Sequence, residues 1–265
     1  MATRLQSVGD ILRDWRGRRR LSQFDLAGEA EVSTRHLSFV ESGRAAPSRD
    51  LLLRLAGPLA LPLRERNRLL LAGGYAPIYS ERSIDEPDMA AARQAVDAVL
   101  RGHMPYPALA VDRHWNLVLA NEAAGALLAD VAPALHEAPV NVLRASLHPR
   151  GLAARIVNLP EWRHHVLTRL RDEADRAGDP VLAALHDELR ALRAPASRHP
   201  PGPGGRIAVP LVLRGSSDGQ NLSFISTTTV FGSATDITLA ELTLECFYPA
   251  DDQTRLALRP TDQRG

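Results

Sequence analysis

The sequence contains almost no cysteine and no long hydrophobic run. Cys246 is the only cysteine among 265 residues, which excludes an internal disulfide framework and a cysteine-rich zinc site. No apolar run approaches the roughly 18 residues that a membrane span requires, and no apolar stretch of the secretory-signal type follows the first arginine. We therefore expect a cytoplasmic protein with no membrane partner.

Lysine is absent as well, so all 32 basic residues are arginine. A genomic composition bias explains this without any functional reason. The arginines are unevenly distributed: residues 1–75 contain 13 arginines and 8 acidic residues, whereas the remainder contains 19 and 23. A basic N-terminal segment followed by a larger, mildly acidic one is typical of a nucleic-acid-binding module joined to a regulatory domain.

Residues 1–75 show helical periodicity, with apolar residues at three- and four-residue steps. Serines stand where helices should begin. The pattern predicts five short helices: one around Val8–Trp15, three that follow the capping residues Ser22, Ser33 and Ser48, and one over residues 64–72. Gly43 is placed to end the third helix. Short helices with a three-residue turn between the second and third form a helix-turn-helix architecture.

The third predicted helix has two different faces. Leu37 and Val40 point toward the core, whereas Thr34, Arg35 and Ser38 fall on the opposite face at 3.6-residue periodicity. The segment LSQFDLAGEAEVSTRHLSFVESGRAAPS, within residues 8–72, resembles the phage-repressor-like (Cro/C1, or XRE-type) helix-turn-helix family. One departure is Glu31, which stands where the family usually places glycine in the turn. Glutamate is less comfortable at a positive φ, so we expect a slightly altered turn.

The resemblance implies that the third helix enters the DNA major groove. The predicted DNA contacts are Gln23, Ser33, Thr34, Arg35, His36, Ser38, Phe39, Arg44 and Arg49. Among them Arg35 is the best candidate for bidentate contact to a guanine, and Gln23 would hold a phosphate through its backbone N–H and side chain. The alternative for each arginine is a solvated surface charge. The family's partly buried ion pair falls on Arg16 and Glu41, which implies a structural role for both.

Residues 76–88 are turn-rich and predict a linker. Beyond them we expect a second domain over residues 89–258 and a tail over 259–265. The predicted order is a helix over 89–101, two strands over 109–119, a helix capped by Asn121, helical residues 141–193, a loop over 194–205, and three strands within 207–246. The fold class is therefore α+β: a helical N-terminal domain, then a five-stranded antiparallel sheet with helices over one face. In the last strand Glu241, Thr243 and Glu245 alternate with apolar residues, which predicts a solvated face.

Three segments of the second domain resemble one family: YPALAVDRHWNLVLAN, NVLRASLHPRGLAARIVNLPEWRHHVLTRLR and LSFISTTTVFGSATDITLAELTLECFYPAD. They are similar to the MmyB-like ligand-binding domain of helix-turn-helix regulators, over about residues 90–258. The resemblance implies a PAS-like fold and a role in transcription regulation. For some members of the family it also implies a fatty-acid-like ligand in the PAS pocket.

A pocket between a sheet and covering helices would be lined by apolar groups and a few polar anchors. Arg155 and Asn158 are the candidate partners of a ligand carboxylate or carbonyl, and Trp162 and Phe224 are candidates for the pocket wall. The alternative is that Arg155 and Asn158 brace a loop and that both aromatic residues are ordinary core. We expect Trp115 to cover the core.

The sequence does not favour a metal site or an enzyme. His164 and His165 are adjacent, so on a helix they point about 100° apart and share one ion poorly. Cys246 is expected to be inert packing, and no Walker or dinucleotide-binding glycine motif is present. The first hypothesis is a ligand-responsive regulator that binds a palindromic operator as a homodimer. In the second, the PAS-like domain serves only dimerisation or protein interaction, and in the third it is an enzyme with a DNA-binding tether.

Overall fold

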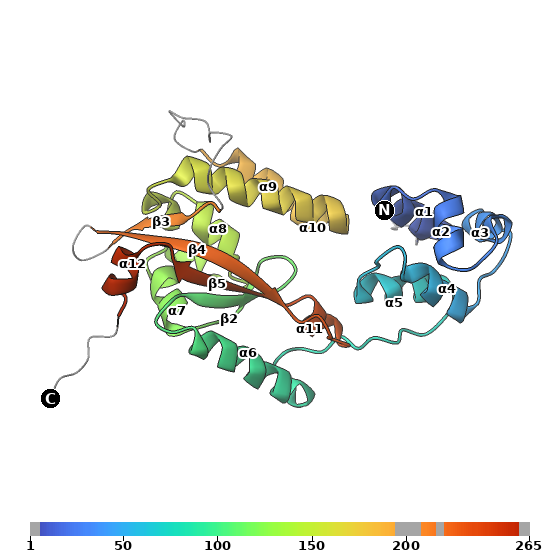
Figure 1. Ribbon diagram of the computed structural model, residues 1–265, viewed down its shortest axis with the longest axis horizontal. Helices are drawn as coiled ribbons and strands as arrows, with labels where there is room; N and C mark the ends of the chain where they lie inside the picture. Colours follow the sequence, from blue (N-terminus) through green and yellow to red (C-terminus); the bar gives the residue numbers. More distant parts are fainter. Residues whose placement is uncertain (1–5, 194–207, 216–219, 260–265) are drawn as a thin grey trace. The chain divides into compact units, whose positions relative to one another are not determined.

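The computed structural model describes residues 6–193, 208–215 and 220–259, which form two compact units (Figure 1). The first unit consists of Met1–Ser83 and Ser233–Ala240, and the second of Ile84–Gly232 and Glu241–Gly265. Each unit has a separate cluster of buried apolar side chains. The predicted loop over residues 194–205 and most of the predicted tail lie outside the described residues.

The first unit contains the five predicted helices. They are α1 (Val8–Arg19), α2 (Gln23–Glu29), α3 (Thr34–Glu41), α4 (Arg49–Ala56) and α5 (Leu63–Ala72), and the short α11 (Ile237–Ala240) packs with α5. The hydroxyls of Ser22, Ser33 and Ser48 each accept a hydrogen bond from a backbone N–H in the first turn that follows, which confirms the predicted N-caps. Gly43, at φ 72°, follows the end of α3 as expected.

The described strands of the second unit form an antiparallel five-stranded sheet, as predicted. The strands are β1 (Ala108–Val111), β2 (Leu117–Ala120), β3 (Leu211–Arg214), β4 (Asn221–Val230) and β5 (Thr243–Pro249), in the spatial order β2-β1-β5-β4-β3. The last strand in sequence therefore lies at the centre of the sheet. It pairs Glu245 with Leu109 on one side and with Thr228 on the other.

Most helices of the second unit lie between β2 and β3 in the sequence; the exceptions are one helix before β1 and one after β5. They are α6 (Ala90–Gly102), α7 (Glu122–Ala129), α8 (Val142–Leu147), α9 (Leu159–Ala177), α10 (Pro180–Ala191) and α12 (Asp252–Ala257), with 3-10 turns at Pro87–Met89, Pro133–Leu135 and Leu152–Ala154. Asn121 caps α7 as predicted. The predicted helical region 141–193 is divided into α8, α9 and α10, and Gly178 at φ 62° ends α9.

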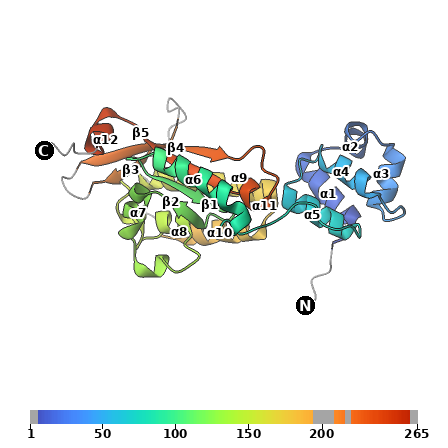
Figure 2. The same ribbon diagram turned by 90° about the horizontal axis from the view of Figure 1, so that it is seen from below.

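Two predictions about the sheet were wrong. We predicted helices over one face of the sheet, but helices lie against both faces: α6 packs on the side opposite α9 (Figures 1 and 2). Glu245 is only 4% exposed, although the alternating pattern of its strand predicted a solvated face. Since β5 is the central strand and both faces are covered, Leu244 and Cys246 are buried toward one layer and Glu245 toward the other.

Candidate functional site

The exposed face of α3 carries the residues expected to meet DNA. Thr34, Arg35 and His36 are exposed, whereas Leu37 and Val40 are buried in the core of the first unit. The guanidinium of Arg35 lies 5.4 Å from the centre of the Phe39 ring, so the arginine rests on the next turn of the same helix. This helix end therefore offers a polar, cationic surface with side chains long enough to reach base edges.

The arginines around this face differ in what they bind. Arg35, Arg44 and Arg49 are exposed and have no ion-pair partner among the described residues. Arg18, in contrast, pairs with Asp14 at 3.0 Å, and Arg19 donates to the carbonyl oxygen of Leu59 at 2.9 Å. The first three arginines are thus available to phosphates, while Arg18 and Arg19 have structural partners within their own unit.

A buried ion pair holds α3 against α1 and α2. Glu41, 3% exposed, accepts hydrogen bonds from Nε and Nη2 of Arg16 at 2.9 and 3.0 Å. The side-chain amide of Gln23 donates to the same carboxylate at 2.7 Å. The hydrogen bond to Glu41 raises the pKa of Arg16 despite partial burial. Gln23, predicted to hold a phosphate, directs its side chain to Glu41, and its backbone N–H lies in the first turn of α2.

The turn between α2 and α3 keeps the conformation that glycine usually provides. Glu31 has φ 54°, in the left-handed region, and its N–H donates to the carbonyl oxygen of Gly28. Ser33 caps α3, because its hydroxyl accepts a hydrogen bond from the N–H of His36 at 3.1 Å. The turn geometry is therefore compatible with a glutamate, at some conformational cost.

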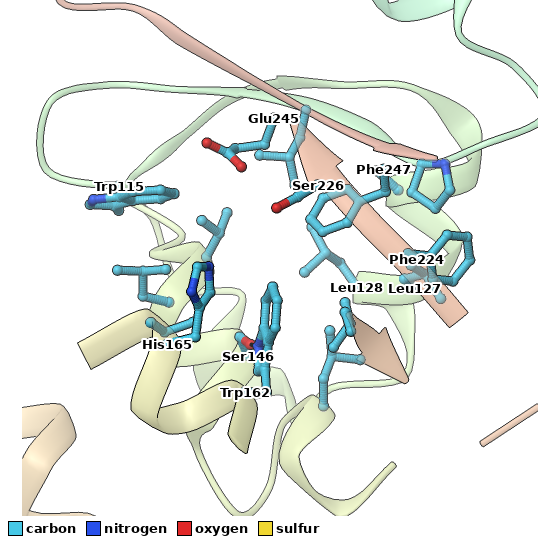
Figure 3. Close-up of a pocket in the computed structure, with 18 of the residues that line it drawn as sticks. Trp115, Leu127, Leu128, Ser146, Trp162, His165, Phe224, Ser226, Glu245 and Phe247 are labelled. Atoms are coloured by element: carbon cyan, nitrogen blue, oxygen red, sulfur yellow. Dashed lines mark hydrogen bonds between the residues drawn. The ribbon is translucent and has the colours of Figure 1, made fainter. Parts of the chain in front are cut away.

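The second unit contains a partly open apolar cavity of about 90 Å³ between the sheet and helices α7, α8 and α9 (Figure 3). Aromatic rings supply much of the wall, from Trp115, Trp162, Phe224 and Phe247. Leucine and valine side chains supply most of the rest, and the polar lining residues are Ser146, His165, Arg169, Ser226 and Glu245. A mostly apolar lining with a few polar groups is typical of small-molecule sites.

A charged cluster lies at one side of this cavity. Arg169 donates from Nη2 to Glu245 at 2.7 Å and from Nε to Glu173 at 2.9 Å, and its guanidinium stacks 4.6 Å from the Trp115 ring. The indole N–H of Trp115 also donates to Glu173, at 2.8 Å. Burial opposes the charge of Arg169, but its hydrogen bond with Glu245 and the nearby carboxylates raise its pKa overall. Burial, with the positive charge of Arg169, lowers the pKa of His165.

The sequence-predicted ligand residues fall into two groups. Trp162 and Phe224 line the cavity, whereas Arg155 and Asn158 are not among its lining residues. Arg155 pairs with Asp130, and Asn158 donates to the carbonyl oxygen of Pro210 at 2.8 Å and accepts from the N–H of Val212 at 3.1 Å. Both side chains thus connect α9 and the loop before it to neighbouring segments.

Sequence reasoning did not find Arg169 or Glu245. Arg169 is one of several charged residues on a long amphipathic helix, and Glu245 alternates with apolar residues in a strand. A glutamate in an otherwise apolar strand was the available signal, because a buried carboxylate requires a partner.

Comparison with known families identifies the chain. A model described as the MmyB-like transcription regulator ligand binding domain matches residues 92–260. The chain belongs to the MmyB-like transcription regulator family. A model described as a helix-turn-helix domain matches residues 7–69 of this MmyB-like regulator. The two matches cover the two parts of the sequence that carried the resemblances.

Other comparisons add little to the family assignment. No curated protein matches this MmyB-like regulator. One solved structure, of an RNA-binding light-oxygen-voltage receptor, is 15% identical with a TM-score of 0.28; the alignment covers 97% of this chain and 62% of that one. The MmyB-like regulator thus spans less than two thirds of that receptor chain, and such a low score supports no argument.

Three further observations concern alternative functions of this MmyB-like regulator. No helix in the described part of the chain is long and apolar enough to span a membrane. Among the described residues, no group of three or more His, Cys, Asp or Glu side chains is arranged to hold a metal ion. The pentapeptide GSSDG at residues 215–219 has the spacing of a hydrolase nucleophile motif, but residues 216–219 lie outside the described part of the chain.

Proposed function

We propose that this protein binds a palindromic operator as a homodimer and that a small apolar ligand in the cavity of its second unit controls this binding. The chain is a helix-turn-helix DNA-binding regulator with an MmyB-like ligand-binding domain. In the proposal α3 reads the major groove through Thr34, Arg35 and Ser38, with His36 and Phe39 beside them. Arg44, Arg49, Ser33 and the backbone of Gln23 hold phosphates.

The observation that supports the ligand proposal most directly is the apolar cavity itself. Its walls are aromatic and aliphatic side chains, and its volume is about 90 Å³. An engineered apolar cavity of about 150 Å³ in another protein binds benzene. A cavity of this size and lining therefore suits a compact apolar molecule, or part of a longer one after small side-chain movements.

A fatty-acid-like ligand, as the family resemblance implies, is one member of this class. Each buried methylene contributes about 0.8 kcal/mol, so affinity should rise with chain length until the cavity is full and then fall through overpacking. Calorimetry with fatty acids and matching alcohols of increasing length tests this expectation. Because Arg155 is engaged by Asp130 outside the cavity lining, Arg155→Ala should change the affinities for acid and alcohol equally.

The experiment that tests the ligand proposal combines native mass spectrometry with DNA binding. A small molecule that co-purifies with the protein and changes operator affinity by at least several-fold would support it. The competing hypothesis makes the second unit a dimerisation or protein-interaction module. That hypothesis is favoured if no molecule co-purifies, no apolar compound binds, and Trp162→Ala alters only folding stability.

The operator proposal is tested by binding-site selection together with the mass of the DNA complex. A homodimer should select two inverted half-sites about one helical turn apart, roughly 10 base pairs between centres. Selection of a single half-site, or a complex that contains one protein chain, would contradict both the palindrome and the dimer.

A further inference from the structure

The charged cluster at the cavity carries an excess of negative charge. Arg169 is the one cation that lines the cavity among the described residues, and it is shared between the carboxylates of Glu245 and Glu173. His165 does not balance the second carboxylate, because burial and Arg169 lower its pKa and favour the neutral ring. A ligand that approaches this side of the cavity therefore meets an environment that disfavours anions.

One oxygen of Glu245 is left for a ligand. Its Oε1 accepts hydrogen bonds from Arg169 at 2.7 Å and from the Thr228 hydroxyl at 2.8 Å. Its Oε2 has no hydrogen-bond partner among the described residues, although the side chain is only 5% exposed. Glu245 lines the cavity, so a donor from a bound molecule would supply a hydrogen bond to this oxygen, and such a bond is stronger to a charged group than to a neutral one.

Three other side chains near Glu245, those of Ser226, His165 and Trp162, line the same cavity. Ser226 lies two residues along β4 from Thr228, on the same side of the sheet as Glu245, and its hydroxyl has no hydrogen-bond partner among the described residues. In Figure 3, Glu245 and Ser226 come from the sheet, while His165 and Trp162 face them from α9. Ser226 and Glu245 thus supply the polar groups of the sheet wall, and Ser146, His165 and Arg169 supply those of the helical wall.

We propose that the cavity selects a small aromatic molecule with a neutral hydrogen-bond donor, such as a phenolic hydroxyl or a ring N–H, which donates to Oε2 of Glu245. The proposal rests on the proposed function, since it names the ligand class of the same cavity. The rings of Trp115, Trp162 and Phe224 fit a flat aromatic molecule. A neutral donor forms a strong bond to a carboxylate without the desolvation cost of a second buried ion. A ligand carboxylate would add a negative charge beside Glu245 and Glu173.

The test compares three ligands of nearly one shape with the full-length protein: p-xylene, p-cresol and p-toluate. Calorimetry should give p-cresol at least about tenfold higher affinity than p-xylene, because a hydrogen bond to a charged group has that strength. The affinity for p-toluate should be lower than that for p-xylene. Equal affinities for p-cresol and p-xylene, or tighter binding of p-toluate, would overturn the proposal and leave the cavity as an apolar ligand site.

A variant identifies the group responsible. In Glu245→Gln the amide oxygen can keep the bond to Arg169, which turns the amide nitrogen, a donor, toward the cavity. That nitrogen can still donate to the phenolic oxygen, but a hydrogen bond between neutral groups is weaker than one to a carboxylate. The advantage of p-cresol over p-xylene should therefore fall several-fold, while the affinity for p-xylene stays within about twofold. As a matched control, Glu188→Gln removes a carboxylate that pairs with Arg144 and does not line the cavity, so the ratio should be unchanged.

The outcomes separate the two proposals. If none of the three ligands binds, and no other apolar compound does, the ligand function of the cavity fails and this inference fails with it. If p-xylene binds but the donor gives no advantage, only the inference fails. If Glu245→Gln does not fold, the ligand series on the unchanged protein still decides the question.

Discussion

At the scale of single residues, Glu41 is a buried charged side chain that connects α3 to two other helices of the first unit. It is 3% exposed and accepts hydrogen bonds from Arg16 and Gln23, both from other helices. Glu41→Ala leaves the guanidinium of Arg16 without its partner in a partly buried place. We expect the free energy of unfolding to fall by about 3 kcal/mol, measured by denaturant titration.

A matched control is Asp14→Ala, which removes an ion pair with Arg18 on the surface of α1. The side chain of Asp14 is 48% exposed, and exposed pairs contribute about 0–1 kcal/mol. Equal losses in the two variants would show that the Arg16–Glu41 pair is no more important than a surface pair.

Arg35 and Arg49 are both exposed and have no ion-pair partner within the described part of the chain, but they occupy different places. Arg35 is the second residue of α3, whereas Arg49 is the first residue of α4. Arg35→Ala should cost about 1–3 kcal/mol of specific binding and relax the preference at one base pair. Arg49→Ala should weaken binding to all sequences and reduce the salt slope by about 1. Binding-site selection at several salt concentrations measures both, and an unchanged base preference in Arg35→Ala would refute the base-reading role.

Glu31 adopts a left-handed backbone at φ 54°, which costs a non-glycine residue about 1 kcal/mol. Glu31→Gly should therefore raise the stability of the first unit by roughly 0.5–1 kcal/mol. Glu29→Gly, the same change at the last helical residue of α2, should lower stability by up to about 1 kcal/mol. Thermal melting of both variants checks the signs, and a loss of stability in Glu31→Gly would show that the glutamate side chain itself stabilises the turn.

At the scale of elements, α2 begins with a reciprocal capping box that responds to pH. The Ser22 hydroxyl accepts from the Asp25 N–H, and the Asp25 carboxylate accepts from the hydroxyl and the N–H of Ser22. These hydrogen bonds lower the pKa of Asp25. The stabilisation by the carboxylate is therefore complete above its ordinary value near 3.8 and is lost as the pH falls through the lower folded value.

Ser22→Ala should accordingly cost about 1 kcal/mol at neutral pH, and less in acid. Urea titrations of this variant and of the unchanged protein between pH 7 and about pH 2 measure the difference in unfolding free energy, because the loss falls below pH 3.8. A difference that stays constant over this range would mean that Asp25 contributes nothing through Ser22.

The elements of the first unit were predictable because their determinants are local. Ser22, Ser33 and Ser48 cap helices within three residues of themselves, and Gly43 ends a helix at its own position. The sheet depends on partners far apart in sequence. Nothing near Glu245 indicates that its strand lies between β1 and β4, or that Arg169 of α9 covers it. The alternating pattern therefore predicted a solvated face where the fold has a second layer.

The candidate ligand site was predictable only in its apolar part. Trp162 and Phe224 line the cavity because large apolar residues in a sheet and its covering helix face the same interior. The polar partners were sought next to that helix in sequence, at Arg155 and Asn158. The structure instead places Arg169, two turns after Trp162, and Glu245 at the cavity. Proximity in sequence was a poor guide, because the position of a charge depends on strand order.

At the scale of the whole molecule, the first unit has its own core, and two further segments are bound to it: the residues directly after α5, and residues 233–240. Its buried cluster draws only on residues 8–75. The segment after α5 is bound to that helix, because Asn67 donates to the carbonyl oxygen of Tyr79 and accepts from the N–H groups of Ile78 and Tyr79. Residues 233–240 join the same unit, with Ile237 only 2% exposed and its N–H donating to Ser80.

A fragment of residues 1–83 should therefore fold on its own, because it keeps every residue of that core and loses only the segment with α11. Circular dichroism should show a cooperative melt, and the base preference should match that of the full chain. If the second unit supplies the dimer contact, affinity for a two-half-site operator should fall at least about tenfold, while affinity for one half-site should not change.

An unfolded fragment would mean that residues 233–240 complete the domain. Ile237→Ala in the full chain would then destabilise the first unit by about 2–5 kcal/mol, and a small effect of that variant is expected if the fragment is stable.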